Sequence, residues 1–144
     1  MKRIEVAITT SDVVRAAKAA SVDSTIRTMP GGYDMVLAQG ASNVSQGERQ
    51  LLTIARAIVA DPEIMILDEA TSNVDAHTEQ LIQDAMATLL KGRTSFVIAH
   101  RLSTVRDADK ILYMEHGDIL ETGTHEELMA LHGRYEELYN SQFA

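Results

Sequence analysis

Asn43-Val44-Ser45-Gln46-Gly47-Glu48 opens the stretch that decides the fold, and a helical pattern to Ala60 leads from it to Ile64-Met65-Ile66-Leu67-Asp68-Glu69. Four apolar residues followed by two acids are typical of a buried strand in a parallel sheet. Open α/β folds place their ligands at the carboxyl edge of such a sheet. The pattern therefore predicts an α/β fold with chemistry at Asp68 and Glu69.

A helix is predicted directly upstream of this strand. Ser45 and Glu48 have the spacing of a capping box, which starts a helix, and Asp61-Pro62 stops it because proline cannot continue the helical hydrogen bonds. The start of a helix has unpaired amides and a positive dipole end, so it is a candidate anion site. The alternative, that Ser45 only caps the helix and Gly47 only relaxes its first turn, stays open.

A second helix and a second strand follow the two acids. The helix carries its apolar side chains on one face and ends near Gly92. Residues 94–99 form the next apolar strand, directly before His100. Strand, helix and strand in this order make a βαβ unit with a parallel sheet. We therefore expect Asp68, Glu69 and His100 at the same edge.

Together these segments resemble the ATPase domain of the ABC superfamily, over nearly the whole chain from about Asp12. Residues 44–48 resemble its signature motif, residues 64–69 its Walker B strand and Ser72-Asn73-Val74-Asp75 its D-loop. His100 resembles its switch histidine. The fold that the resemblance implies is α/β, a partial P-loop NTPase core with a parallel sheet and part of the α-helical signature subdomain.

The resemblance also implies ATP and Mg as cofactors and gives each motif a role in hydrolysis. Glu69 is implied to act on the attacking water, and His100 to hold that water or to contact the γ-phosphate. Asp68 is implied to bind Mg, because phosphoanhydride hydrolysis needs a metal to neutralise phosphate charge. The residues implied to contact the nucleotide of the opposite subunit, or to couple the two sites, are Ser45, Gln46, Gly47, Glu48 and Asp75.

The signature departs from the usual Leu-Ser-Gly-Gly-Gln at three positions. Val44 replaces the leucine, Gln46 the first glycine and Glu48 the glutamine. Ser45 and Gly47 are retained, so the pair that faces phosphate in the family is present.

One family motif is missing. None of the eight glycines begins the pattern G-x-x-x-x-G-K-[ST] that cradles phosphates, and no glutamine precedes Gln39 to supply a Gln loop. The chain is therefore identified with the C-terminal part of an ABC ATPase domain, and we expect little ATPase activity from it alone.

Residues 1–44 are predicted to hold an N-terminal segment and part of the helical subdomain. Residues 45–144 are predicted to hold the signature helix, Walker B, the D-loop, the switch histidine and the rest of the core.

Composition limits the classes of partner. The 144 residues are 45% hydrophobic and 24% charged, as in one soluble globular domain. A net charge of −8 with 13 scattered basic residues argues against nucleic acid. The chain has no cysteine, which excludes disulfides and thiolate metal sites. No apolar run approaches the roughly 20 residues of a membrane helix, so a membrane association is expected only through another chain or a missing segment.

Flanking patterns predict further elements. Near the N-terminus, residues 10–12 offer caps for a first helix, residues 22–28 form a second, and Met29-Pro30-Gly31-Gly32-Tyr33-Asp34 is a loop. The loop with the residues up to Gly40 resembles the segment ahead of the signature in exporters. Residues 101–106 are expected to form a short helix.

Nearer the C-terminus, His116-Gly117 is a hairpin turn and Thr124 with Glu127 is a second capping box. A last helix follows Gly133, with three side chains expected to face inward, and His125 is interpreted as an ordinary surface residue. The three inward side chains are Tyr135, Leu138 and Tyr139.

The leading hypothesis is an exporter-type ATPase portion that powers transmembrane export when joined to the missing Walker A half and a membrane domain. The partners implied are ATP, a second ABC ATPase domain in a head-to-tail dimer and a transmembrane domain, at the cytoplasmic face of the plasma membrane. Expressed alone, the chain is expected in the soluble cytoplasm. Without the P-loop strand, residues 94–99 are expected to form an apolar edge.

Two other functions share some of these motifs. ABC-type ATPases of DNA repair or chromosome organisation share the signature and Walker B, but they usually separate their halves by long coiled coils, and the chain has neither heptads nor a basic surface. A non-catalytic module that pairs with a complete ATPase domain and lends its signature in trans is the second alternative. It predicts that Ser45→Arg abolishes stimulation of the partner.

Overall fold

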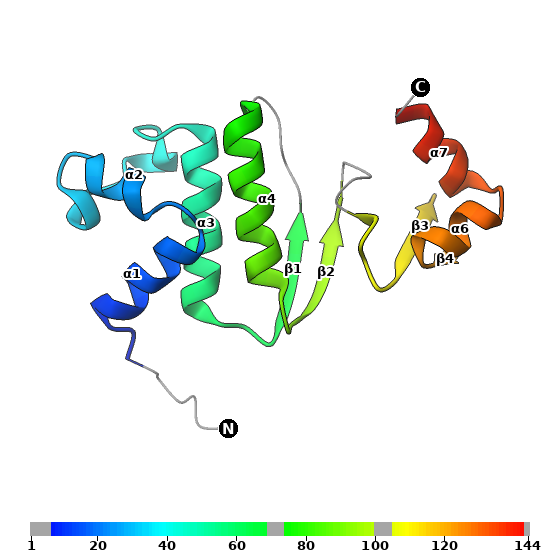
Figure 1. Cartoon of the computed structure of the whole chain (residues 1–144), viewed down its shortest axis with the longest axis horizontal. Coiled ribbons are helices and arrows are strands. Elements are labelled where there is room, and N and C mark those ends of the chain that lie inside the picture. Colours follow the sequence, from blue (N-terminus) through cyan, green and yellow to red (C-terminus); the bar gives the residue numbers. More distant parts are fainter. Residues whose placement is uncertain (1–6, 69–73, 100–104, 143–144) are drawn as a thin grey trace. The chain divides into compact units, whose positions relative to one another are not determined.

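The computed structural model describes residues 7–68, 74–99 and 105–142, which carry the colours in Figure 1. The chain divides into two compact units. The first consists of Met1–Met65 and Thr71–Ser95, and the second of Ile66–Ala70 and Phe96–Ala144.

The first unit is mainly helical, and its longest helices pack side by side. Helix α3 (Gln46–Ala60) packs against α1 (Thr10–Ala19) on one side and against α4 (Ala76–Leu90) on the other (Figure 1). The helices present small and branched apolar residues to one another, as their periodic patterns predict. The buried apolar side chains of these helices are Ala16, Ala17, Leu51, Ile54, Ala55, Ile82, Ala85 and Leu89.

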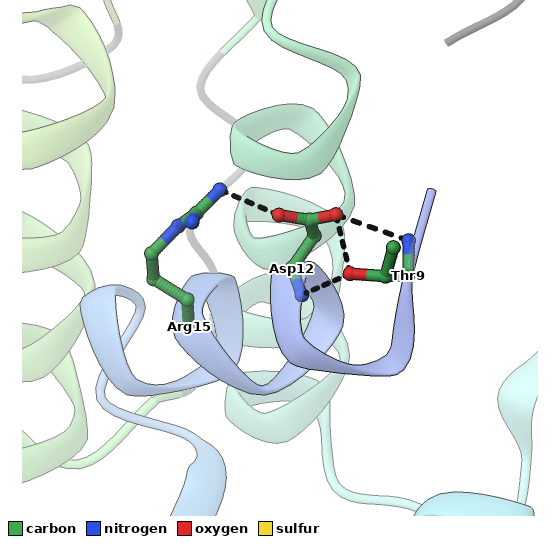
Figure 2. Close-up of polar contacts among 3 residues, drawn as sticks. All are labelled: Thr9, Asp12 and Arg15. Atoms are coloured by element: carbon green, nitrogen blue, oxygen red, sulfur yellow. Dashed lines mark hydrogen bonds and ion pairs between the residues drawn. The ribbon is translucent and has the colours of Figure 1, made fainter. Parts of the chain in front are cut away.

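A capping box starts α1 one residue earlier than the predicted caps. The Thr9 hydroxyl accepts from the Asp12 amide at 3.2 Å, and the Asp12 carboxylate accepts from the Thr9 amide at 3.0 Å. Arg15 pairs with the same carboxylate at 2.8 Å (Figure 2). Hydrogen bonds from Thr9, together with the charge of Arg15, lower the pKa of Asp12.

Between α1 and α3 the chain forms short helices. Helix α2 (Asp23–Thr28) is followed by two single turns, η1 (Gly32–Asp34) and η2 (Gln39–Ala41). The Tyr33 hydroxyl donates to the Asp23 carboxylate at 2.6 Å, and Arg27 donates to the same carboxylate at 3.0 Å. The hydrogen bond from Tyr33 holds the predicted loop against α2.

Tyr33 should ionise late in an alkaline titration. Burial, and next the hydrogen bond to Asp23, raises its pKa to about 12 from the ordinary value of 10.0. Since the folded pKa is the higher one, its contribution to stability is complete below pH 10 and is lost as the pH rises towards 12. Tyrosinate absorbance measured against pH should therefore lose its latest step in Tyr33→Phe but keep it in the control Tyr113→Phe. A Tyr33→Phe curve with that step intact would contradict the assignment.

The α/β prediction is confirmed, and the predicted strands form the sheet. Strands β1 (Ile64–Asp68) and β2 (Thr94–Ile98) pair side by side and run in the same direction, with α4 between them in the sequence (Figure 1). Within the described residues this sheet has two strands, so β2 lies at an edge, as predicted.

The expectation that residues 64–67 are buried is wrong in part. Met65 is buried, but Ile64 is 65% and Ile66 72% exposed. Phe96 and Ile98 on β2 are likewise more than half exposed. A strand is buried on both faces only when both faces of its sheet are covered. In the described part of the chain, alternate residues of both strands remain exposed to solvent.

The second unit is built on the predicted hairpin. Strands β3 (Ile111–Glu115) and β4 (Asp118–Gly123) are antiparallel. His116 and Gly117 both have positive φ, 53° and 92°, which a two-residue turn of this handedness needs.

Among the described residues of this unit, two helices follow the hairpin. Helix α6 (His125–Ala130) begins at the predicted capping box of Thr124 and Glu127, and α7 (Arg134–Gln142) follows Gly133. The buried core of the unit consists of Ile111, Leu128 and Tyr135.

Helix α7 is capped from outside itself. The Glu121 carboxylate on β4 accepts from the Arg134 amide at 2.6 Å and from the Tyr135 amide at 3.1 Å. Gly133 allows this approach, because a Cβ there would collide with the Glu121 side chain. This contact could not be predicted from local spacing, since the cap comes from a strand and not from the residues before the helix.

Two expectations for this unit are corrected. His125 is not an ordinary surface residue: it is half-buried, and its Nδ1 lies 2.9 Å from the Tyr135 hydroxyl. Its ring centroid lies 4.9 Å from that of Tyr139. Tyr135 faces inward as predicted, but Leu138 is 39% exposed, because the inward side of α7 is filled by the two tyrosines. The short helix predicted at residues 101–106 falls mostly outside the described residues.

Candidate functional site

The first turn of α3 has the geometry that the capping box predicts. The Ser45 hydroxyl accepts from the Glu48 amide at 3.2 Å, and the Ser45 amide donates to the Glu48 carboxylate at 2.7 Å. The backbone amides of Gln46 and Gly47 lie in the first turn, so no carbonyl of the helix accepts from them. They therefore point outward from the N-terminal end of the helix. Fifteen residues of aligned peptides add a positive dipole end at this place. The turn is suited to bind an anion.

Gly47 lies at a close contact between two helices. It is buried, and a Cβ built on it would collide with Cγ2 of Thr78 and lie 3.4 Å from Cγ1 of Val74. Thr78 lies in the first turn of α4, and Val74 lies just before that helix. The side chain is therefore excluded at residue 47 by packing, which neither interpretation of this glycine from the sequence had included.

Asp75 caps α4, as its position predicts. Its carboxylate accepts from the Thr78 amide at 3.0 Å. Hydrogen bonds from Thr78, the backbone amide first, lower the pKa of Asp75, so the cap stays charged well into acid. The structure thus places the signature-like turn beside Val74 and Asp75, the described part of the D-loop-like segment, at the start of a neighbouring helix.

The segment before the signature-like turn is clamped by Asn43. The amide oxygen of Asn43 accepts from the Ala38 backbone at 3.0 Å, and its amide nitrogen donates to the Val36 carbonyl at 3.2 Å. Val36 remains 85% exposed and Leu37 46% exposed. Sequence reasoning missed this clamp, because an asparagine next to Val44 gives no sign of which loop carbonyl it bonds.

Asp68 ends β1, and its side chain is exposed. A carboxylate oxygen is a ligand that Mg²⁺ prefers, and proteins commonly hold this ion by one or two carboxylates together with substrate phosphates. Asp68 therefore fits the role that the resemblance implies. Among the described residues no group of three or more potential metal ligands gathers. Glu69 and His100 lie outside the described residues.

Comparisons with known proteins agree with these motifs. A family model described as ABC transporter matches residues 3–72. The chain is 52% identical over 132 residues, 92% of its length, to the ABC transporter ATP-binding protein YfiC of Bacillus subtilis. It is 53% identical over 130 residues, 90% of its length, to the fatty acid ABC transporter ATP-binding/permease protein of Mycobacterium bovis.

A solved structure supports the same assignment. The structure of a bacterial Atm1-family ABC exporter with ATP bound superimposes with a TM-score of 0.84 at 38% identity, covering 96% of this chain and 24% of that one. The chain spans about a fifth of the length of the two relatives, 22% and 21%. In the described part of the chain, none of the helices has the length and apolar character to cross a membrane. The chain belongs to the ABC transporter family.

Proposed function

We propose that this chain is the C-terminal portion of an exporter's ATP-binding domain, and that the start of α3 contacts the γ-phosphate of ATP held by a second ATP-binding domain. The observation that carries the proposal is the capped first turn of α3 directly beside the capped start of α4. Gln46 and Gly47 supply backbone amides to the phosphate and Ser45 its hydroxyl, while Glu48 holds the turn through its bonds with Ser45. Asp75 contributes to the coupling of the two sites.

The remaining site residues have distinct tasks in this proposal. Asp68 would hold Mg, which when bound neutralises phosphate charge. Glu69 orients the attacking water and accepts its proton, and His100 holds that water or donates to the γ-phosphate. The exposed pair Val36 and Leu37 faces the transmembrane domain, at the cytoplasmic side of the membrane.

A second candidate is a non-catalytic role. In that case the chain holds no nucleotide of its own and lends its signature-like turn to a complete ATP-binding domain. The sequence observation that favours it is the lack of a G-x-x-x-x-G-K-[ST] cradle in the 144 residues. Both candidates require the same surface at the start of α3, but they differ in whether the chain hydrolyses ATP when the cradle is supplied.

The purified chain should show no saturable binding of Mg-ATP. The physical reason is that the backbone amides and lysine that hold the terminal phosphates are not in this sequence. Calorimetry with Mg-ATP measures this, and Glu69→Gln serves as the control. Turnover that Glu69→Gln abolishes would show that the chain builds a cradle of another kind.

A mixing experiment tests the trans contact. The chain is added to a complete ATP-binding domain of a relative, whose own signature serine is replaced by arginine so that this surface must come from the chain. ATPase activity should rise with the concentration of the chain. An unchanged rate at saturating chain would refute the trans contact.

A further inference from the structure

Thr78 is shared by the two motifs that the proposed function uses. Its backbone amide donates to the Asp75 carboxylate at 3.0 Å, which caps α4. Its Cγ2 methyl lies against the backbone of Gly47, so closely that no Cβ fits between them. One residue therefore connects the D-loop-like cap to the second residue of the signature-like helix.

The contact is stiff on both sides. On α3 the capping box of Ser45 and Glu48 fixes the first turn, and on α4 the Asp75 cap fixes the turn that carries Thr78. Val74, just before that cap, closes the other side of the contact. Packed interiors transmit displacement because they have little free volume. Because no Cβ fits between Gly47 and Thr78, a displacement of residues 74–78 towards α3 would press on its first turn.

We propose that Thr78 is a positioning residue for the first turn of α3. Its methyl group sets the position of the amides in that turn, so that residues 74–78 and the phosphate-contacting turn move together. The inference rests on the proposed function and adds a positioning residue to that site.

The test is a double-substitution cycle. Gly47→Ala adds the methyl that collides with Thr78, and Thr78→Ser removes the Cγ2 methyl while keeping the hydroxyl. Gly47→Ala should lower the stimulated ATPase rate per folded chain about tenfold or more, since a displacement near 1 Å can cost on the order of 100-fold. The double variant should recover most of that loss. Rates are measured in the mixing experiment at saturating partner and ATP.

Stability is measured in parallel. Overpacking destabilises a packed contact, so the melting temperature of Gly47→Ala should fall by roughly 3–9 °C and recover in the double variant. If Gly47→Ala does not fold, Thr78→Ser alone serves as the second variant: it leaves a gap at the contact and should lower the stimulated rate several-fold. Thr78→Val fills the same space and should retain the rate.

The matched control is Thr88→Ser. Thr88 lies on the same helix and is exposed, and its hydroxyl donates to the Asp84 carbonyl, a bond that serine retains. This variant should leave stimulation and melting unchanged.

Four outcomes overturn the inference. A double variant that recovers melting but not stimulation shows a contact with a structural role alone. A Gly47→Ala variant with normal melting and stimulation shows that the contact is absent. If the wild-type chain gives no stimulation, the proposed function is refuted, and the inference with it. If the wild-type chain stimulates normally and no variant alters the rate, only the inference is refuted.

Discussion

Ser45→Arg should abolish the stimulation of a complete ATP-binding domain by this chain, a loss well beyond the about 100-fold that removal of one donor to a developing charge costs. Arginine removes the hydroxyl, and its long side chain fills the space before the first amides of α3. A phosphate of the partner's nucleotide then has no access to those amides.

The control for this prediction separates blocking from loss of the cap. Ser45→Ala removes the hydroxyl that accepts from the Glu48 amide, which costs about 1 kcal/mol of helix stability, but it leaves the space open. It should retain part of the stimulation, while Ser45→Arg retains none. Equal activity of the arginine variant and the wild-type chain would end the trans role for this surface.

Tyr135→Ala should unfold much of the second unit. Tyr135 is 1% exposed and packs with Ile111 and Leu128 in the buried core. Removing a large buried aromatic side chain costs about 3–5 kcal/mol, which approaches the whole stability of a small unit, ~5–15 kcal/mol. Hydrogen exchange of the β3 and β4 amides measures the loss.

Two controls accompany this change. Tyr135→Phe keeps the ring and loses only the hydroxyl bonded to His125, which should cost about 1 kcal/mol. Leu138→Ala alters an exposed residue of the same helix and should cost well under 1 kcal/mol. If Tyr135→Ala protected the hairpin amides as well as Leu138→Ala does, the core would not depend on this ring.

Local signals in the sequence were sufficient for most of the elements. The capping boxes at Ser45 and Thr124, the stop at Asp61-Pro62 and the turn at His116-Gly117 each depend on residues within four positions of one another. Such contacts are encoded in the spacing of residue types, which is why these boundaries agree with the structure.

What could not be predicted depends on residues far apart in the chain. The close contact of Gly47 with Thr78 joins two helices separated by a strand, and the bond of His125 to Tyr135 joins two helices across a turn. The exposure of Ile64 and Ile66 depends on which layers cover the sheet, which no periodicity within five residues reveals. The roles of Asp68, Glu69 and His100 stay predictions from the family resemblance.

The cap that Glu121 gives to α7 has a consequence for the order of folding. A nine-residue helix is marginal by itself, and the acceptor for its first amides lies 13 and 14 positions earlier, on β4. The hairpin must therefore be in place before α7 gains its cap. In kinetic terms, we expect this cap to form late, so that Glu121→Ala speeds unfolding and leaves the folding rate nearly unchanged in stopped-flow measurements.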